Sequence, residues 1–203
     1  MPLKDGRYTG PLYRALNPVY AREPLSGRGA ELYGGRFNAK GTPALYTSLD
    51  PATALREANQ VGSLQPTILV SYKADLGPIF DTRDQDRLER YGMTASMLAD
   101  TAWRMKMLEG QSVPTQDLAS ALIADRFAGF LIQSFAKGAL SSDFNIVLWA
   151  WSGNKGCCRS RLIFLVGHSR ELVKTENSDD GVSCHQRLRL PGADDARVDG
   201  TCV

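Results

Sequence analysis

The chain has 203 residues, 43% of them hydrophobic, which suits one globular domain with a core of its own. Its formal charge of +2 is close to balance, so charge alone indicates neither a nucleic-acid-binding surface nor a membrane-binding surface. The longest apolar run, residues 162–166, is far too short to cross a bilayer, and residues 1–6 lack the apolar centre of a secretion signal. We therefore expect a cytoplasmic protein.

Cysteine and histidine do not form a metal-binding pattern in this sequence. Cys157 and Cys158 are adjacent, and Cys184 and Cys202 follow at long intervals, unlike the regular spacing of zinc ligands. The two histidines, His168 and His185, are far apart in sequence and lack the usual clustering of metal ligands. We expect reduced thiols and no bound metal.

The first fifty residues combine short strands with a long loop. Residues 11–16 are expected to be extended and residues 44–48 to form a strand. Residues 17–35 are rich in proline and glycine, which predicts a loop. That loop and the turn after it carry several arginines, and a long cationic loop inside a compact domain is uncommon unless it binds something.

A helix is expected next, from Asp50 as N-cap and Pro51 at the first helical position to about residue 60. Ala52, Leu55 and Ala58 are expected to mark its packed side.

The remaining elements are predicted from β-branched runs, amphipathic spacing and glycine punctuation. The expected strands are residues 67–72, 78–81, 129–134, 144–151 and 161–166, and the expected helical regions are 84–109 and 115–127. Strands interleaved with helices, without regular β-α-β spacing, predict an α+β fold. We expect one domain over residues 1–175, followed by a flexible polar tail over residues 176–203.

Several nucleotide and hydrolase motifs are missing from the sequence. No Gly-x-Gly-x-x-Gly opens a helix after a strand, and no phosphate-binding Gly-x-x-x-x-Gly-Lys-Ser/Thr is present. Ser134 lacks the glycine elbow of serine hydrolases. A ligand site, if present, must be assembled from separate elements.

Three side chains on successive elements fit such a site. Arg36 lies in the turn Gly34-Gly35-Arg36-Phe37-Asn38, Tyr46 lies on the next strand, and Glu57 lies on the following helix. Consecutive elements are usually neighbours in space. Arginine binds pyrophosphate through paired charge-assisted hydrogen bonds, and a fixed carboxylate stabilises the positive charge that develops when a bond from a ribose to nicotinamide breaks.

These residues resemble the RES domain family, named after an arginine, a glutamate and a serine. The resemblance is dense over residues 13–60, with Tyr-Arg-Ala at 13–15, the Gly-Gly-Arg-Phe-Asn turn, Tyr-Thr-Ser at 46–48 and Arg-Glu at 56–57. It continues more thinly at Ser134 and at residues 145–149. Residues 84–116 and the tail have no counterpart that we can match.

The resemblance implies a bacterial toxin of a toxin–antitoxin pair, with a fold similar to diphtheria-toxin-like ADP-ribosyltransferases. It implies NAD as the substrate, cleaved at the nicotinamide–ribose bond by hydrolysis or phosphorolysis, with inorganic phosphate as one acceptor. It also implies an Xre-like antitoxin that blocks the NAD pocket. Alternatives are transfer of ADP-ribose to a protein, and a non-catalytic module that binds an antitoxin or a nucleotide.

By motif match, the resemblance assigns Glu57 as the catalytic carboxylate and Arg14 and Arg36 to the phosphates and ribose of NAD. It assigns Tyr46 to the nicotinamide side and Ser134 as the family's serine. From the residues alone, binding is the favoured role of Arg14 and a structural ion pair is the alternative, while Ser134 is balanced between a structural hydroxyl and a site residue. Trp149 and Trp151 are expected on one side of a strand, in core or antitoxin-interface packing.

Overall fold

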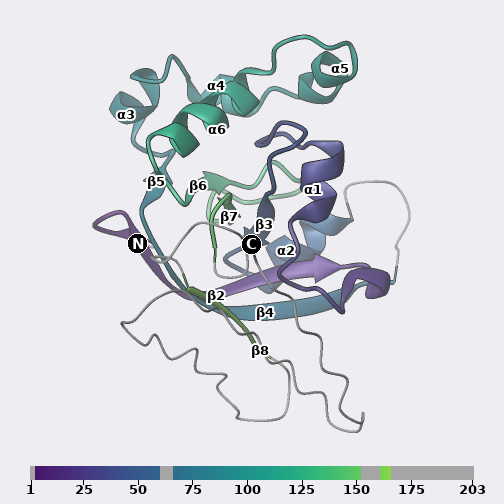
Figure 1. Ribbon diagram of the computed structural model, residues 1–203. Coiled ribbons are helices and arrows are strands. Elements are labelled where there is room, and N and C mark those ends of the chain that lie inside the picture. The colour runs from purple at the N-terminus through teal and green to yellow at the C-terminus, as the bar shows by residue number, and fades with distance from the viewer. Residues whose placement is uncertain (1–2, 60–65, 152–160, 166–203) are drawn as a thin grey trace, which may run out of the picture. The chain divides into compact units, whose positions relative to one another are not determined.

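A mixed sheet organises the structure, which is a computed structural model (Figure 1). It describes residues 3–59, 66–151 and 161–165, and of residues 164 and 165 it describes the backbone alone. The described residues contribute the strands β1 (Leu3–Lys4), β2 (Arg7–Leu16), β3 (Leu45–Ser48), β4 (Ile68–Leu76), β5 (Ile79–Asp81), β6 (Gly129–Gln133), β7 (Phe144–Leu148) and β8 (Arg161–Leu165). They contribute the helices η1 (Pro18–Tyr20, 3₁₀), α1 (Arg28–Tyr33), α2 (Pro51–Ala58), α3 (Gln85–Glu89), α4 (Ala95–Leu98), α5 (Trp103–Leu108) and α6 (Pro114–Ala124). The fold is therefore α+β, as the sequence predicts.

The strands are ordered β5-β6-β7-β3-β2-β4-β8, and β1 pairs with β2. Among the described strands, β5 and β6 are parallel and the other pairs are antiparallel. β2 pairs with β4 along its whole length from Tyr8 to Leu16, but it pairs with β3 only where Tyr13 faces Ser48. The two halves of the sheet thus meet at one position and diverge beyond it.

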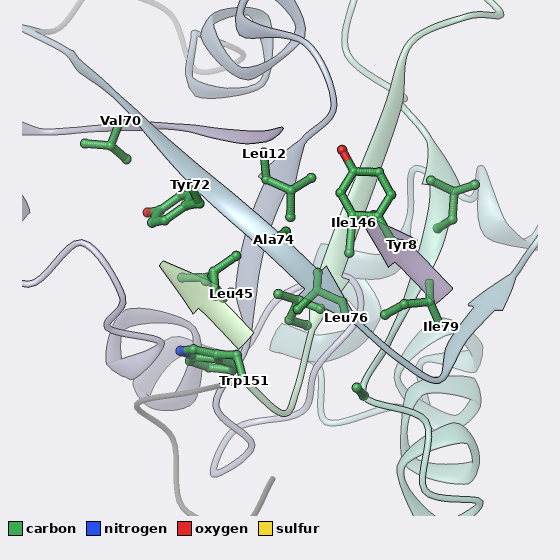
Figure 2. Packing of buried hydrophobic residues seen from close by; sticks show 14 of the residues in the cluster. Tyr8, Leu12, Leu45, Val70, Tyr72, Ala74, Leu76, Ile79, Ile146 and Trp151 are labelled. Atoms are coloured by element: carbon green, nitrogen blue, oxygen red, sulfur yellow. The ribbon is translucent and has the colours of Figure 1, made fainter. Parts of the chain in front are cut away.

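Side chains alternate between the two faces of the sheet along each strand. Both faces carry a buried hydrophobic cluster. On β6, Leu131 packs into one hydrophobic cluster while Phe130 and Ile132 pack into another. On β7, Ile146 and Val147 divide in the same way. Figure 2 shows the first cluster, which draws on β2, β3, β4 and Trp151.

The second cluster lies between the sheet and the helices that follow β5. Leu88 of α3, Leu98 of α4 and Leu122 of α6 are buried there. Figure 1 shows these helices gathered beside β5 and β6. The region that the sequence predicts as helix-prone, residues 84–109, is helical but divided into α3, α4 and α5.

The predicted loop over residues 17–35 is wrong in part, because it contains α1. Tertiary bonds hold this helix in place: Asn38 Nδ2 donates to the carbonyl of Ala30 at 2.8 Å, and the Gly41 N–H donates to the carbonyl of Glu31 at 2.8 Å. Composition alone could not indicate these partners, and tertiary contacts outweigh local propensity in so short a helix.

The predicted strand over residues 144–151 is too long. β7 ends at Leu148, so Trp149 and Trp151 follow the strand, and they belong to different clusters. Their indole N–H groups donate to the carbonyls of Phe37 at 2.9 Å and Leu25 at 3.0 Å. Both rings are buried, and each anchors the segment that leads into or out of the Arg36 turn.

Some predictions fall on residues that the structure does not describe. These are the four cysteines, both histidines and the tail over residues 176–203. All described residues belong to one unit, Met1–Arg170. Among the described helices, none is long and apolar enough to cross a membrane.

Candidate functional site

A cavity of about 410 Å³ lies where β2 and β3 diverge. Its lining comes from β2, β3, β6, β7, α2, α5 and the glycine turn at residues 34–37. A volume of this size is typical of small-molecule sites. The predicted site residues Arg14, Arg36, Tyr46 and Glu57 all line it, although they come from four different segments.

Arg36 is carried into the cavity by a tight turn. Gly34 ends α1 with a φ of 73°, in the region that favours glycine, and its N–H donates to the carbonyl of Ala30 at 2.8 Å. Gly35 and Asn38 then close the turn as an isolated bridge. The start of α6 supports the same turn, since Thr115 Oγ1 donates to the Arg36 carbonyl at 2.6 Å.

The Arg36 guanidinium has no hydrogen-bond or ion-pair partner within the described residues. It lies 5.0 Å from the ring centre of Phe135, 5.9 Å from that of Trp103 and 6.0 Å from that of Phe37. Burial lowers the pKa of Arg36, and the nearby carboxylates of Glu57 and Asp100 oppose that shift. Arg36 is thus a half-buried cation held among aromatic rings, and no described residue accepts a hydrogen bond from its guanidinium. Such a group is suited to bind an anion.

Tyr46 holds the turn with its hydroxyl and faces the cavity with part of its surface. The hydroxyl donates to Asn38 Oδ1 at 2.7 Å and accepts the N–H of Phe37 at 3.2 Å. Burial raises the pKa of Tyr46, while the Phe37 N–H and the charge of Arg36 oppose that shift. The phenol therefore remains protonated and supports the turn.

Asn38 is the other half of this network. It is fully buried, and its Nδ2 donates to the carbonyls of Ala30 and Thr42 at 2.8 and 2.9 Å. The Asn38 side chain thus links α1, the Arg36 turn and the approach to β3. Its place in the motif Gly-Gly-Arg-Phe-Asn was the only sequence signal of this structural role.

Arg14, on β2, combines a structural bond with a place in the cavity lining. Its Nη1 donates to the carbonyls of Pro24 at 3.2 Å and Ser26 at 3.1 Å. Burial lowers the pKa of Arg14, and the neighbouring Tyr72 opposes the shift. Tyr72 also donates to the Pro24 carbonyl, at 2.6 Å. Arg14 therefore positions the loop before α1 from a point on the cavity wall.

Glu57 reaches the cavity from α2. The packed face of this helix differs from the predicted one. Ala52, Leu55 and Ala58 are exposed, and the buried positions are Thr53 and Ala54. Glu57 lies four and three residues after these, so it shares their inward face. The N-terminal prediction is confirmed, since the Asp50 carboxylate accepts the N–H groups of Ala52 and Thr53 and Pro51 takes the first position.

The carboxylate of Glu57 is held by two donors on one oxygen. Ser134 Oγ and Asn145 Nδ2 each lie 2.6 Å from Glu57 Oε1. Asn145 is itself oriented by Ser48, whose Oγ donates to Asn145 Oδ1 at 2.7 Å. Ser134 is buried and does not line the cavity among the described residues, so it contacts the site through Glu57.

Several cavity residues were not among the predicted site residues. Asn145 appeared in the sequence only as part of a thin resemblance, and Trp103 and Arg104 come from the unmatched region before α6. Phe135 follows Ser134 directly and also lines the cavity. No local pattern distinguishes these residues, because each depends on contacts across the fold.

The described lining carries three guanidinium groups, from Arg14, Arg36 and Arg104, against the single carboxylate of Glu57. An excess of cations favours a ligand with more than one negative charge. The lone carboxylate, oriented by two hydrogen bonds, is placed to interact with a hydroxyl or a developing positive charge. No group of three or more metal-ligating side chains occurs within residues 3–59, 66–151 and 161–165.

The structure thus combines an α+β fold with a cavity that is rich in cationic side chains. The sequence model of the RES domain matches residues 11–161, about three quarters of the chain, and the chain belongs to that family. Comparison with curated proteins gives no match.

Among solved structures, the chain is similar to one from the crystal structure of the M. tuberculosis MbcT–MbcA toxin–antitoxin complex. The TM-score is 0.52 and the sequence identity is 19%, over 78% of this chain and 85% of the other. At this identity the likeness establishes a shared fold.

Proposed function

We propose that this chain is the toxin of a toxin–antitoxin pair and that it cleaves the bond between nicotinamide and ribose in NAD. The observation that carries the proposal is that one cavity holds two groups: the Arg36 guanidinium, which has no hydrogen-bond or ion-pair partner among the described residues, and the Glu57 carboxylate, which Ser134 and Asn145 hold. Membership of the RES domain family and the likeness to a chain in a toxin–antitoxin complex support it.

In the proposed reaction, Arg36 and Arg14 bind the pyrophosphate and the adjacent ribose. The bond from the ribose carbon to the nicotinamide nitrogen breaks, and its electron pair neutralises the positive pyridinium ring. The ribose carbon gains oxocarbenium character, which the Glu57 carboxylate stabilises. Water then attacks and releases ADP-ribose and a proton, or phosphate attacks and leaves ADP-ribose bearing a phosphate at that carbon.

Tyr46 is proposed to contact the nicotinamide side with its ring, because its hydroxyl is already occupied by the Arg36 turn. Ser134 acts by holding Glu57. The proposed inhibitor is an Xre-like antitoxin that covers the cavity, and the proposed site of action is the cytoplasm, where NAD is available. The diphtheria-toxin-like ADP-ribosyltransferases offer the nearest chemical comparison for such a site.

Nicotinamide release from NAD by the purified chain tests the proposal. Reactions with and without phosphate, together with labelled NAD, distinguish water, phosphate and a protein side chain as acceptors. Failure to release nicotinamide, with no labelled protein, would contradict NAD chemistry. A non-catalytic module would also leave bacterial growth and cellular NAD unchanged when expressed.

Glu57→Gln tests the carboxylate. The amide oxygen can still accept the bonds from Ser134 and Asn145, so the fold should persist. Two unit charges about 4 Å apart interact by about 4 kcal/mol at the effective dielectric of partly buried sites, so loss of the charge should lower kcat by about 10³-fold. Glu89→Gln, at an exposed position of α3, is the control and should leave kcat unchanged. An undiminished rate in Glu57→Gln would remove Glu57 from the mechanism.

A further inference from the structure

Two adjacent residues of α2 contact the same hairpin between β6 and β7. Glu57 is held by Ser134 and Asn145, as described above. Its neighbour Arg56 forms an ion pair with Asp143, with 2.5 Å between Nη1 and Oδ2. Arg56 and Asp143 are absent from the described residues that line the cavity, so any effect on the chemistry is indirect, and Glu57 is the lining residue next to Arg56.

Asp143 organises the end of this hairpin. Its Oδ2 accepts the N–H of Leu140 at 2.9 Å, and its backbone N–H donates to the Leu140 carbonyl at 3.0 Å. Its own carbonyl accepts the N–H of Ser134 at 2.8 Å. Asn145 follows two residues later, on β7. Asp143 thus bonds directly to the backbone of Ser134 and lies two residues from Asn145, and these two residues are the donors to Glu57.

The ion pair of Arg56 lies in the C-terminal half of α2. α2 has only eight residues, and its N-terminal end is fixed by Asp50 and Pro51. Its buried positions, Thr53 and Ala54, lie in the first half and carry small side chains. The Arg56 and Asp143 side chains are 31% and 12% exposed, so the ion pair is partly shielded from water and stronger than a surface pair.

The geometry points to Arg56 and Asp143 as positioning residues that align the Glu57 carboxylate with the reacting ribose. The ion pair fixes α2 against the hairpin, and Ser134 and Asn145 then meet Glu57 Oε1 at hydrogen-bond distance. The inference rests on the proposed NAD cleavage, since positioning acts on that reaction.

Steady-state nicotinamide release by the full chain tests this role. Arg56→Gln and Asp143→Asn should each lower kcat by about 10- to 100-fold, the effect of about 1 Å of misplacement, while KM changes less than about threefold because neither residue contacts NAD. The double variant should be no slower than either single variant, because both changes break one pair. Arg56→Lys should recover most of kcat, since it restores the charge.

Arg7→Gln is the control, because it breaks the exposed ion pair between Arg7 and Asp75 at the far end of β2 from Arg14. It should leave kcat and KM unchanged. A rise in KM at constant kcat in Arg56→Gln would overturn positioning in favour of substrate binding. Loss of stability without loss of kcat would reduce the ion pair to a structural contact.

Hydrogen exchange separates this inference from the proposed function. The amides of residues 55–59 should exchange faster in Arg56→Gln than in wild type, and Arg7→Gln should not change them. If wild type releases no nicotinamide, the proposed function fails, while faster exchange still supports the anchor. Unchanged exchange in Arg56→Gln overturns the anchor, whatever the wild-type protein does to NAD.

Discussion

Replacing Tyr46 by phenylalanine tests whether the Arg36 turn depends on a single hydroxyl. The phenol donates to Asn38 Oδ1 at 2.7 Å and accepts the Phe37 N–H at 3.2 Å. Tyr46→Phe removes both bonds and keeps the ring in the cavity wall. Any ring contact with a ligand is therefore retained, and only support for the turn is lost.

The expected loss of stability follows from the groups left behind. Asn38 is fully buried, and its Oδ1 loses the tyrosine donor. A buried polar group left unsatisfied costs about 1–3 kcal/mol, so the two groups together should lower the free energy of unfolding by about 2–6 kcal/mol. For a domain of this size each kcal/mol shifts Tm by about 2–4 °C, so Tm should fall by about 4–24 °C.

Denaturant unfolding, thermal unfolding and nicotinamide release measure the two consequences. We expect KM for NAD to rise as well, because Arg36 is no longer held in one orientation. Tyr91→Phe is the matched control: its hydroxyl donates to Asp125 Oδ2 at 2.6 Å in an exposed position, so stability should change by less than about 0.5 kcal/mol. If Tyr46→Phe unfolds as wild type does and keeps its KM, the turn does not depend on the hydroxyl.

Three further substitutions test neighbouring features. A Cβ at Gly35 would lie 2.5 Å from the Tyr46 hydroxyl and 2.6 Å from Asn38 Oδ1, so Gly35→Ala should lower stability by about 1–3 kcal/mol and weaken NAD binding, as unfolding and nicotinamide release would show. Arg36→Lys keeps the charge but loses the planar pair of donors, so KM for NAD should rise about tenfold or more with little change in Tm. Thr53 Oγ1 is buried with no hydrogen-bond partner in the described part of the chain, so Thr53→Val should leave Tm unchanged or raise it, and a clear fall in Tm would contradict that assignment.

The local elements of the fold were largely accessible from the sequence because their signals are short-range. Asp50 and Pro51 mark the start of α2 through a capping bond and a fixed φ, both of which depend on adjacent residues alone. The β-branched run at 67–72 predicts the core of β4, which extends to Leu76. These predictions are confirmed because no distant contact competes with them.

The face of α2 was mispredicted because eight residues contain little periodic information. Leu55 suggested an apolar stripe, yet its side chain is 38% exposed and the small residues Thr53 and Ala54 pack inward. A short helix that lies close to a sheet can bury small side chains. The face of the helix that comes nearest to the sheet is then the buried face, whether or not its side chains are large and apolar. Because Glu57 lies on the same face of α2 as Thr53 and Ala54, it points toward the cavity.

The partners of Glu57 show what lies beyond local sequence reasoning. Ser134 and Asn145 follow it by 77 and 88 positions. They are brought to it by the pairing of β3 with β7 and of β7 with β6, which aligns Ser48 with Asn145. The order of strands in a sheet depends on the whole fold. Family resemblance therefore indicated Ser134 as a site residue, and no local sequence pattern indicated Asn145.

Arg14 and Arg36 show why residue type alone does not define a binding role. Both are half-buried arginines on the cavity wall, and burial lowers the pKa of each. Arg14 directs its Nη1 to the carbonyls of Pro24 and Ser26, so part of its donor capacity already maintains the fold. Arg36 makes no such bond within the described residues. Among nearby groups, the carboxylate of Glu57 does most to favour the charged form of Arg36 and so opposes the lowering of its pKa by burial. Among the described residues, a ligand phosphate would satisfy Arg36 without displacing a hydrogen bond, which supports our proposal that Arg36 is the principal anion-binding group of the site.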